Sequence, residues 1–140
     1  MTNTLYCHSL SILFYSFYGK NYKEVTHIKV LHLKDLEDKC VYEFAEGRFN
    51  KEHWKESSIY VTFEDFNKLS PFIEEIMPEF NYYGPNTVSI FQWNKLKEKI
   101  IIKFRQEKLD NINLLDPFNE IDIWVQDCFK NHGHFSILGP

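Results

Sequence analysis

The sequence predicts an α+β fold in which about three helices pack against a mostly antiparallel sheet. Segments with strand character are concentrated in the first part of the chain. Segments with helical spacing follow, with short strands between them. The composition is that of a folded protein, since 44% of the 140 residues are hydrophobic and 17% are aromatic. This length accommodates one domain, residues 1–140, with a substantial core.

Four segments carry the strand signal before the first predicted helix. Residues 9–18 are β-prone and apolar on both faces, which is typical of an interior strand, and residues 26–33 alternate more regularly. Residues 40–44 and 59–61 predict two further short strands. The polar, charged residues 46–58 between them predict either a short helix or an exposed loop.

Capping residues mark the first helix. Thr62 is the expected N-cap, with Asp65 at the third helical position. Pro71 cannot supply an interior amide, so we expect the helix either to kink there or to restart with Ser70 as a new cap. Pro78 is expected to close this element.

A second helix is predicted after an aromatic segment. Residues 80–83 are expected to be extended, and residues 84–86, Gly-Pro-Asn, are expected to turn the chain. Ser89 and Gln92 have the spacing of a capping box, and the helix that they begin places Trp93 on its inward face.

A third helix is expected to begin at Asp116-Pro117, because the carboxylate can cap the helix and proline suits its first position. Its inward stripe consists of apolar side chains at helical spacing: Phe118, Ile121, Trp124, Val125 and Cys128. Residues 135–138 predict a closing strand.

Cysteine usage predicts a cytoplasmic protein. Cys7, Cys40 and Cys128 stand far apart and are odd in number, so they cannot all pair internally. Free cysteine is usually buried, and we expect three reduced, packed thiols. Residues 9–18 lack a preceding basic region and end too early to span a bilayer, so neither a signal peptide nor a membrane segment is predicted.

Charge is divided unevenly along the chain, whose formal net charge is −4. Residues 64–79 carry five acidic side chains against one lysine, and residues 110–127 carry five with no Lys or Arg. Residues 95–108 carry six basic side chains against two acidic ones. Two explanations fit such blocks. They are either ordinary solvated faces with helix-capping carboxylates, or an acidic docking surface for a basic protein.

No residue pattern specifies a reaction. His132 and His134 match no standard zinc spacing. His53 with Glu52 or Glu56 has the residue types of a general acid–base pair. However, no nucleophile elbow, Walker loop or dinucleotide turn accompanies them. We therefore expect no cofactor, no metal and no catalytic residue.

Two passages combine aromatic residues with turn and strand signals. Residues 80–86, FNYYGPN, lead through Val88 and Ser89 into a helix with Trp93 and Leu96, and residues 134–140, HFSILGP, form an apolar strand at the end of the chain. Both resemble the immunity proteins of bacterial polymorphic toxin and contact-dependent growth inhibition systems. Many of these small α+β proteins have a tyrosine-glycine turn before a helix and finish in such a strand. The stiffer Pro-Asn turn and the final proline depart from that pattern.

The resemblance implies a protein that binds a cognate toxin domain stoichiometrically in the cytoplasm and blocks its active site or substrate groove. Many such toxins are nucleases with basic clefts, which an acidic surface would complement. No nucleic acid or membrane partner is implied. The expected contacts are acidic side chains of the two acidic blocks with two aromatic anchors: Glu74, Glu75, Glu79, Asp116, Glu120, Asp122, Asp127, Trp54 and Tyr83.

Two other functions remain open at this level. A small enzyme would need a cleft with converging titratable residues. A nucleic-acid-binding module would use the basic residues 95–108, and its binding would depend steeply on salt.

Overall fold

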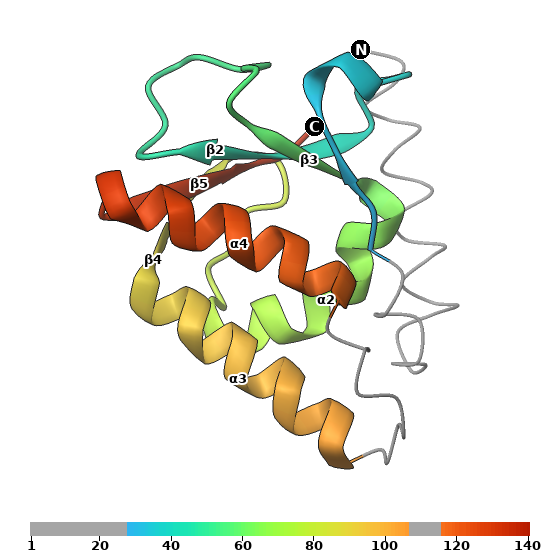
Figure 1. Cartoon of the computed structure of the whole chain (residues 1–140), viewed down its shortest axis with the longest axis vertical. Helices are drawn as coiled ribbons and strands as arrows, with labels where there is room; N and C mark the ends of the chain where they lie inside the picture. Colours follow the sequence, from blue (N-terminus) through green and yellow to red (C-terminus); the bar gives the residue numbers. More distant parts are fainter. Residues whose placement is uncertain (1–27, 107–115) are drawn as a thin grey trace.

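The computed structural model describes residues 28–106 and 116–140. These residues form a five-stranded antiparallel sheet with three α-helices packed on one face (Figure 1). The spatial order of the strands is β1-β3-β2-β5-β4. The predicted α+β class, with a mostly antiparallel sheet and about three helices, is confirmed. Within these residues, no helix has the length and apolar character needed to cross a membrane.

The described elements, in chain order, are β1 (Val30–Leu31), a 3-10 turn η2 (Leu33–Asp35), β2 (Val41–Glu46), β3 (Ile59–Thr62), α2 (Phe63–Ile76), β4 (Pro85–Ser89), α3 (Ile90–Gln106), α4 (Asp116–Asn131) and β5 (His134–Leu138). Strand β2 lies at the centre of the sheet. Its Phe44 is opposite Ile59 of β3 and Ile137 of β5. The predicted strand over residues 9–18 lies outside the described residues.

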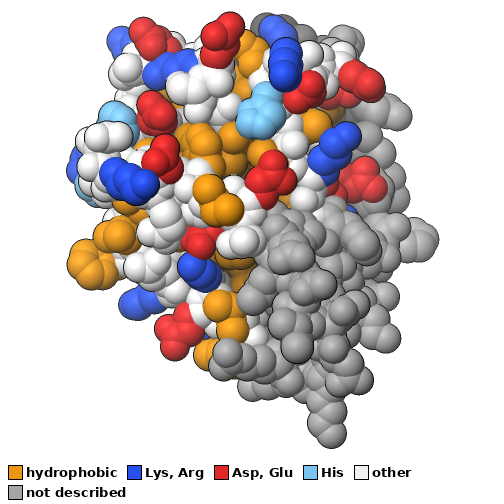
Figure 2. Space-filling view, in the orientation of Figure 1, with side chains coloured by type: hydrophobic (Ala, Val, Ile, Leu, Met, Phe, Trp, Pro, Cys, Tyr) orange, Lys and Arg blue, Asp and Glu red, His pale blue; other side chains and the backbone are white. Residues whose placement is uncertain are grey.

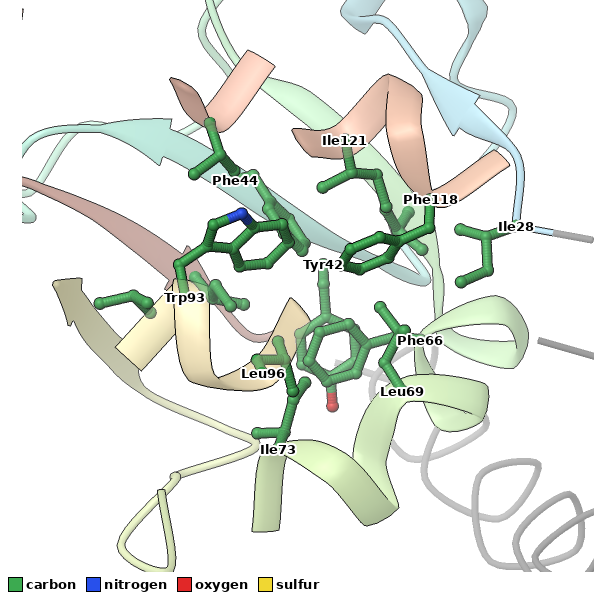
Figure 3. Close-up of a cluster of buried hydrophobic side chains, with 14 of the residues drawn as sticks. Ile28, Tyr42, Phe44, Phe66, Leu69, Ile73, Trp93, Leu96, Phe118 and Ile121 are labelled. Carbon is green, nitrogen blue, oxygen red and sulfur yellow. The ribbon is translucent and has the colours of Figure 1, made fainter. Parts of the chain in front are cut away.

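An aromatic core fills the space between the sheet and the helices (Figure 3). The rings of Tyr42 and Phe66 stack at 3.8 Å between centroids, and those of Trp93 and Phe118 stack at 5.2 Å. Burying one such side chain contributes roughly 1.5–3 kcal/mol. The Tyr42 hydroxyl is buried without a hydrogen-bond partner among the described residues, and burial raises the pKa of Tyr42.

Two of the three predicted N-caps, Thr62 and Ser89, are confirmed, and the side chain of the third, Asp116, is not among those that the structure describes. The Asp65 amide donates to Oγ1 of Thr62 at 3.1 Å. At the start of α3 the Ser89 amide donates to Oε1 of Gln92 at 2.9 Å, and the Gln92 amide donates to Oγ of Ser89 at 3.2 Å. These two reciprocal bonds make a capping box, which satisfies amides that have no partner inside the helix.

Helix α2 runs through Pro71 without restarting. In a regular helix the amide of residue 71 would donate to the carbonyl of Asn67, and proline has no such amide. The Ser70 hydroxyl donates to that carbonyl instead, at 2.8 Å. The alternative of a new helix capped by Ser70 is therefore wrong.

Strand β4 is the main departure from the predicted elements. The turn lies at residues 81–84, where the Gly84 amide donates to the carbonyl of Asn81, and Pro85 and Asn86 already belong to the strand. The side chain of Asn86 holds this turn, accepting from the Asn81 amide at 2.7 Å and donating to the carbonyls of Asn81 and Gly84. Pairing with β5, rather than local alternation, makes this segment a strand.

The 81–84 turn and the end of the chain pack against each other. The Gly139 amide donates to the carbonyl of Gly84. A Cβ at Gly139 would lie 2.1 Å from the carbonyl oxygen of Tyr82, so only glycine fits there. The two passages that carry the resemblance are thus adjacent parts of one structural unit.

Three further expectations are resolved. Residues 47–58 between β2 and β3 form a loop, not a helix. The predicted strand over residues 26–33 is reduced in the described part to β1. Cys40 is disulfide-bonded, so the expectation of three reduced thiols is wrong; Cys128 is free and buried.

Candidate protein-binding surface

A groove of 310 Å³ runs between the end of α2 and the edge of β4. Its walls come from α2 and the turn after it, from β4 and from the first turn of α3: Ile76, Met77, Pro78, Glu79, Phe80, Pro85, Asn86, Thr87 and Gln92. Alternate side chains of a strand point to opposite faces. Because three successive β4 residues line the groove, it follows the edge of the strand.

The acidic side chains predicted at residues 74–79 lie at and beside this groove. Glu74 accepts a hydrogen bond from the Tyr82 hydroxyl at 2.6 Å, and Glu75 forms an ion pair with Lys99 of α3. Glu79 is exposed, lines the groove and makes no ion pair with any described residue. Of these three side chains, Glu79 is therefore the one free to meet a cation from outside.

Exposed apolar side chains lie next to the groove-lining residues in the sequence. Tyr83, in the turn before β4, is 56% exposed, and Phe91, beside Gln92 in the first turn of α3, is 78% exposed. Ile90 is also exposed. Figure 2 shows hydrophobic side chains projecting from the left side of the molecule, where β4 meets α3 in Figure 1. Exposed aromatic side chains are typical anchors of protein interfaces.

The free edge of β4 is largely protected from pairing with another strand. Among the described strands, β4 pairs with β5 alone. Residues 85, 87 and 89 direct their backbone groups to the same side. Pro85 has no amide, and the Ser89 amide donates to Gln92, so Thr87 is the β4 residue left to direct an amide outward. We therefore expect side-chain contacts, not strand addition, at this edge.

Asp122 does not belong to an exposed acidic surface, which corrects its predicted role. It is 6% exposed and accepts from Trp93 Nε1 at 2.8 Å, from Lys97 Nζ at 2.6 Å and from Gln126 Nε2 at 3.2 Å. Burial alone would raise the pKa of Asp122, but these hydrogen bonds, with the charge of Lys97, lower it overall. Asp122 is a clamp between α3 and α4.

The remaining predicted contacts of α4 are on its outer surface. Glu120 is exposed, and Asp127 is exposed with its carboxylate 3.3 Å from Lys130 Nζ. The side chain of Asp116 is outside the described residues. Neither Glu120 nor Asp127 lines the groove between α2 and β4.

Trp54 is half-buried and lies in the loop between β2 and β3. Its ring stacks on that of Tyr60 at 5.9 Å, and Lys39 Nζ lies 5.3 Å from its ring centroid. Its φ of 60° is in the left-handed region, which non-glycine residues seldom adopt. Its position is therefore set by contacts within the chain, and its predicted role as a partner anchor stays a prediction.

A buried carboxylate that the sequence reading missed holds this loop to the sheet. Glu43 of β2 is 2% exposed and accepts from the amides of Trp54 and Lys55, at 3.0 and 3.3 Å, and from the Ser58 hydroxyl at 2.8 Å. Its strand neighbours Tyr42 and Phe44 face the helices, so Glu43 lies on the opposite face, where Figure 1 shows the loop.

His53, which the sequence offered as an acid–base candidate with Glu52 or Glu56, meets a different carboxylate in the structure. His53 Nδ1 lies 3.5 Å from Oε2 of Glu43. The Ser58 hydroxyl donates to the carboxylate of Glu43 and Ser58 is 1% exposed, so this hydroxyl is not an accessible nucleophile. This arrangement anchors a loop. Among the described residues no group of three His, Cys, Asp or Glu is placed to hold a metal ion.

Two signals in the sequence could have found the missed residues. Glu43 interrupts an otherwise apolar run from Val41 to Ala45, and a lone acid in a buried strand requires internal partners. Phe91 lies outside the inward stripe of its helix, which contains Trp93, Leu96 and Ile100. An aromatic side chain off the stripe is expected to be exposed.

No family model matches the chain, and no curated protein or solved structure is significantly similar to it. The proposed function is therefore argued from the geometry of the site.

Proposed function

We propose that this protein is a toxin-neutralising immunity protein, which binds a cognate toxin domain stoichiometrically and blocks its active site or substrate groove. The observation that supports it best is the groove between α2 and β4, which the unpaired Glu79 lines. The exposed Tyr83 lies in the turn before β4, and the exposed Phe91 is next to the lining residue Gln92 in the chain. A carboxylate beside aromatic anchors is suited to a basic protein surface.

The proposed binding surface consists of Glu74, Glu79, Tyr83 and Phe91 with the groove. Glu75 contributes less, because Lys99 already neutralises it. A toxin that acts on nucleic acid would offer a basic substrate cleft to this surface. Inhibition then follows from occupying the cleft, and no catalytic step by this chain is required.

Nucleic-acid binding by α3 is less well supported. Two of its lysines are engaged inside the molecule, Lys97 with Asp122 and Lys99 with Glu75. Each ion pair reduces the positive potential available to phosphates. A filter-binding or polarisation assay across salt concentrations tests this alternative, which requires affinity that falls steeply as salt rises.

The compartment is a separate part of the proposal. An inhibitor of a toxin with intracellular targets would act in the cytoplasm of the producing cell. Disulfides persist mainly in oxidising compartments, so the disulfide of Cys40 is an observation against that location. Thiol labelling of the protein recovered from its native cell tests the point: a Cys40 that reacts only after reduction excludes the cytoplasmic assignment.

The experiment for function is co-expression with the toxin domain encoded by a neighbouring gene. The expected result is a one-to-one complex on size-exclusion chromatography and rescue of growth, both reduced by the double variant Glu79→Lys/Phe91→Ala. The matched control is Glu64→Lys, which reverses an exposed charge at the other end of α2. Failure of every neighbouring gene product to bind or to harm the cell would reject the proposal.

A further inference from the structure

Negative potential from separate sources converges on the groove. The groove lies at the C-terminal end of α2, since Ile76 is the last helical residue and Met77 and Pro78 line the wall after it. A helix C-terminus carries a partial negative charge from its unpaired carbonyls. The last turn of α2 contains no basic residue, and it carries Glu74 as well as Glu75, whose charge is offset by Lys99 of α3.

The carboxylate of Glu79 adds a full charge to the groove lining. It is the only ionisable side chain among the lining residues, and it has no ion-pair partner among the described residues. Two neighbouring polar side chains already make hydrogen bonds within the chain. Asn86 uses its amide on Asn81, Gly84 and Ile137, and Gln92 uses Oε1 on the Ser89 amide. Electrostatics in the groove therefore select a cation.

Apolar atoms border that charge. Met77 and Phe80 bring hydrophobic surface from the α2 side, and Pro85 brings it from β4. A side chain with an aliphatic stem and a cationic head matches this combination, because the stem packs on apolar surface while the head reaches the acid. Arginine fits best, since its planar head can donate two parallel hydrogen bonds to one carboxylate and stack on an aromatic ring.

We propose that the groove receives an arginine side chain from the partner protein, with Glu79 as its acceptor and the C-terminal end of α2 as a second source of attraction. The inference rests on the proposed function for the source of the arginine. It does not need the toxin for its test, because the groove should recognise the side chain alone.

The test is an NMR titration of the full-length, 15N-labelled protein with N-acetyl-arginine methylamide. The expected result is a set of saturable shifts at the amides of Glu79, Thr87 and Gln92. The citrulline analogue, which has the same shape without the charge, is expected to bind at least about threefold more weakly, as for an exposed ion pair. Equal binding of the two analogues, or shifts that map elsewhere, would overturn the proposal.

Two variants complete the design. Glu79→Gln keeps the size of the side chain and is expected to reduce arginine affinity to the level of citrulline. Glu64→Gln, at the first turn of α2, is the matched control and should leave the titration unchanged. If Glu79→Gln titrates like the parent, the assignment of Glu79 fails.

The outcome separates the two proposals. A toxin that binds tightly to a protein whose groove ignores arginine would reject this inference and leave the function intact. Arginine binding in the groove by a protein that neutralises no toxin would support this inference and reject the proposed function.

Discussion

The buried and the exposed carboxylates of this protein differ in how many hydrogen-bond and ion-pair partners their own chain provides. Asp122 and Glu43 are each surrounded by three or more donors from their own chain. Glu79 has no ion-pair partner within the described residues. Acidic residues that look alike in the sequence therefore have two different roles in the structure. Buried acids stabilise the fold at specific joints, and only the unpaired acids are available to a second molecule.

The two buried carboxylates also differ from each other. Asp122 joins two helices through side chains, including the cation of Lys97. Glu43 joins a loop to the sheet largely through backbone amides of that loop. Four variants compare these two carboxylates with the buried Tyr42 hydroxyl and with Glu79 of the groove, in order of the expected change in unfolding free energy.

Glu43→Ala is expected to give the largest loss of stability, about 3 kcal/mol, because the buried Ser58 hydroxyl and the part-buried amides of Trp54 and Lys55 lose their acceptor. Urea unfolding measures it. The loop residues should also become more open to proteolysis. Glu52→Ala is the exposed control from the same loop, and a comparable loss in both variants would contradict the role given to Glu43.

Asp122→Asn is expected to cost about 2 kcal/mol at neutral pH, since it removes the charge that Lys97 and Trp93 bind. The pKa of Asp122 is lowered in the folded state, so its contribution is complete above the ordinary carboxyl pKa of ~4 and is lost as the pH falls through the folded-state pKa. The difference in unfolding free energy between parent and variant should therefore narrow in acid. A difference independent of pH, or an equal effect of Asp127→Asn, counts against this clamp.

Tyr42→Phe is expected to raise the unfolding free energy by about 1 kcal/mol, because it removes a buried hydroxyl that has no described partner and keeps the ring stack with Phe66. Thermal unfolding of parent and variant measures the difference. Tyr42→Leu serves as the control and should be destabilising through loss of the stack. A destabilised Tyr42→Phe would show that the hydroxyl has a partner.

Glu79→Gln is expected to leave the unfolding free energy within about 0.5 kcal/mol of the parent, the smallest change of the four. Its effect should appear in binding instead. Stability and partner affinity should both be measured for Glu79→Gln and Asp122→Asn. Glu79→Gln is expected to lower mainly the affinity, and Asp122→Asn mainly the unfolding free energy. A stability loss at Glu79 as large as that at Asp122 would remove the distinction.

Much of the helical framework was predictable because its signals are local. Thr62 with Asp65, and Ser89 with Gln92, cap helices through contacts that span three residues, and the structure has both. The central strands β2 and β3 followed from short apolar runs bounded by polar residues. The site was less predictable. Charge and composition predict Glu74, Glu79 and Tyr83 as contacts, but they carry no information on burial and predict the buried Asp122 equally.

The α+β class and the starts of the helices follow from the sequence alone, because periodicity and capping act within a few residues. The remaining features depend on contacts between distant parts of the chain. The strand character of β4 comes from β5, and the groove exists because that strand lies beside the end of α2. Whether a carboxylate stabilises the fold or faces a partner depends on the groups that distant parts of the chain bring within about 3 Å of it, the length of a hydrogen bond.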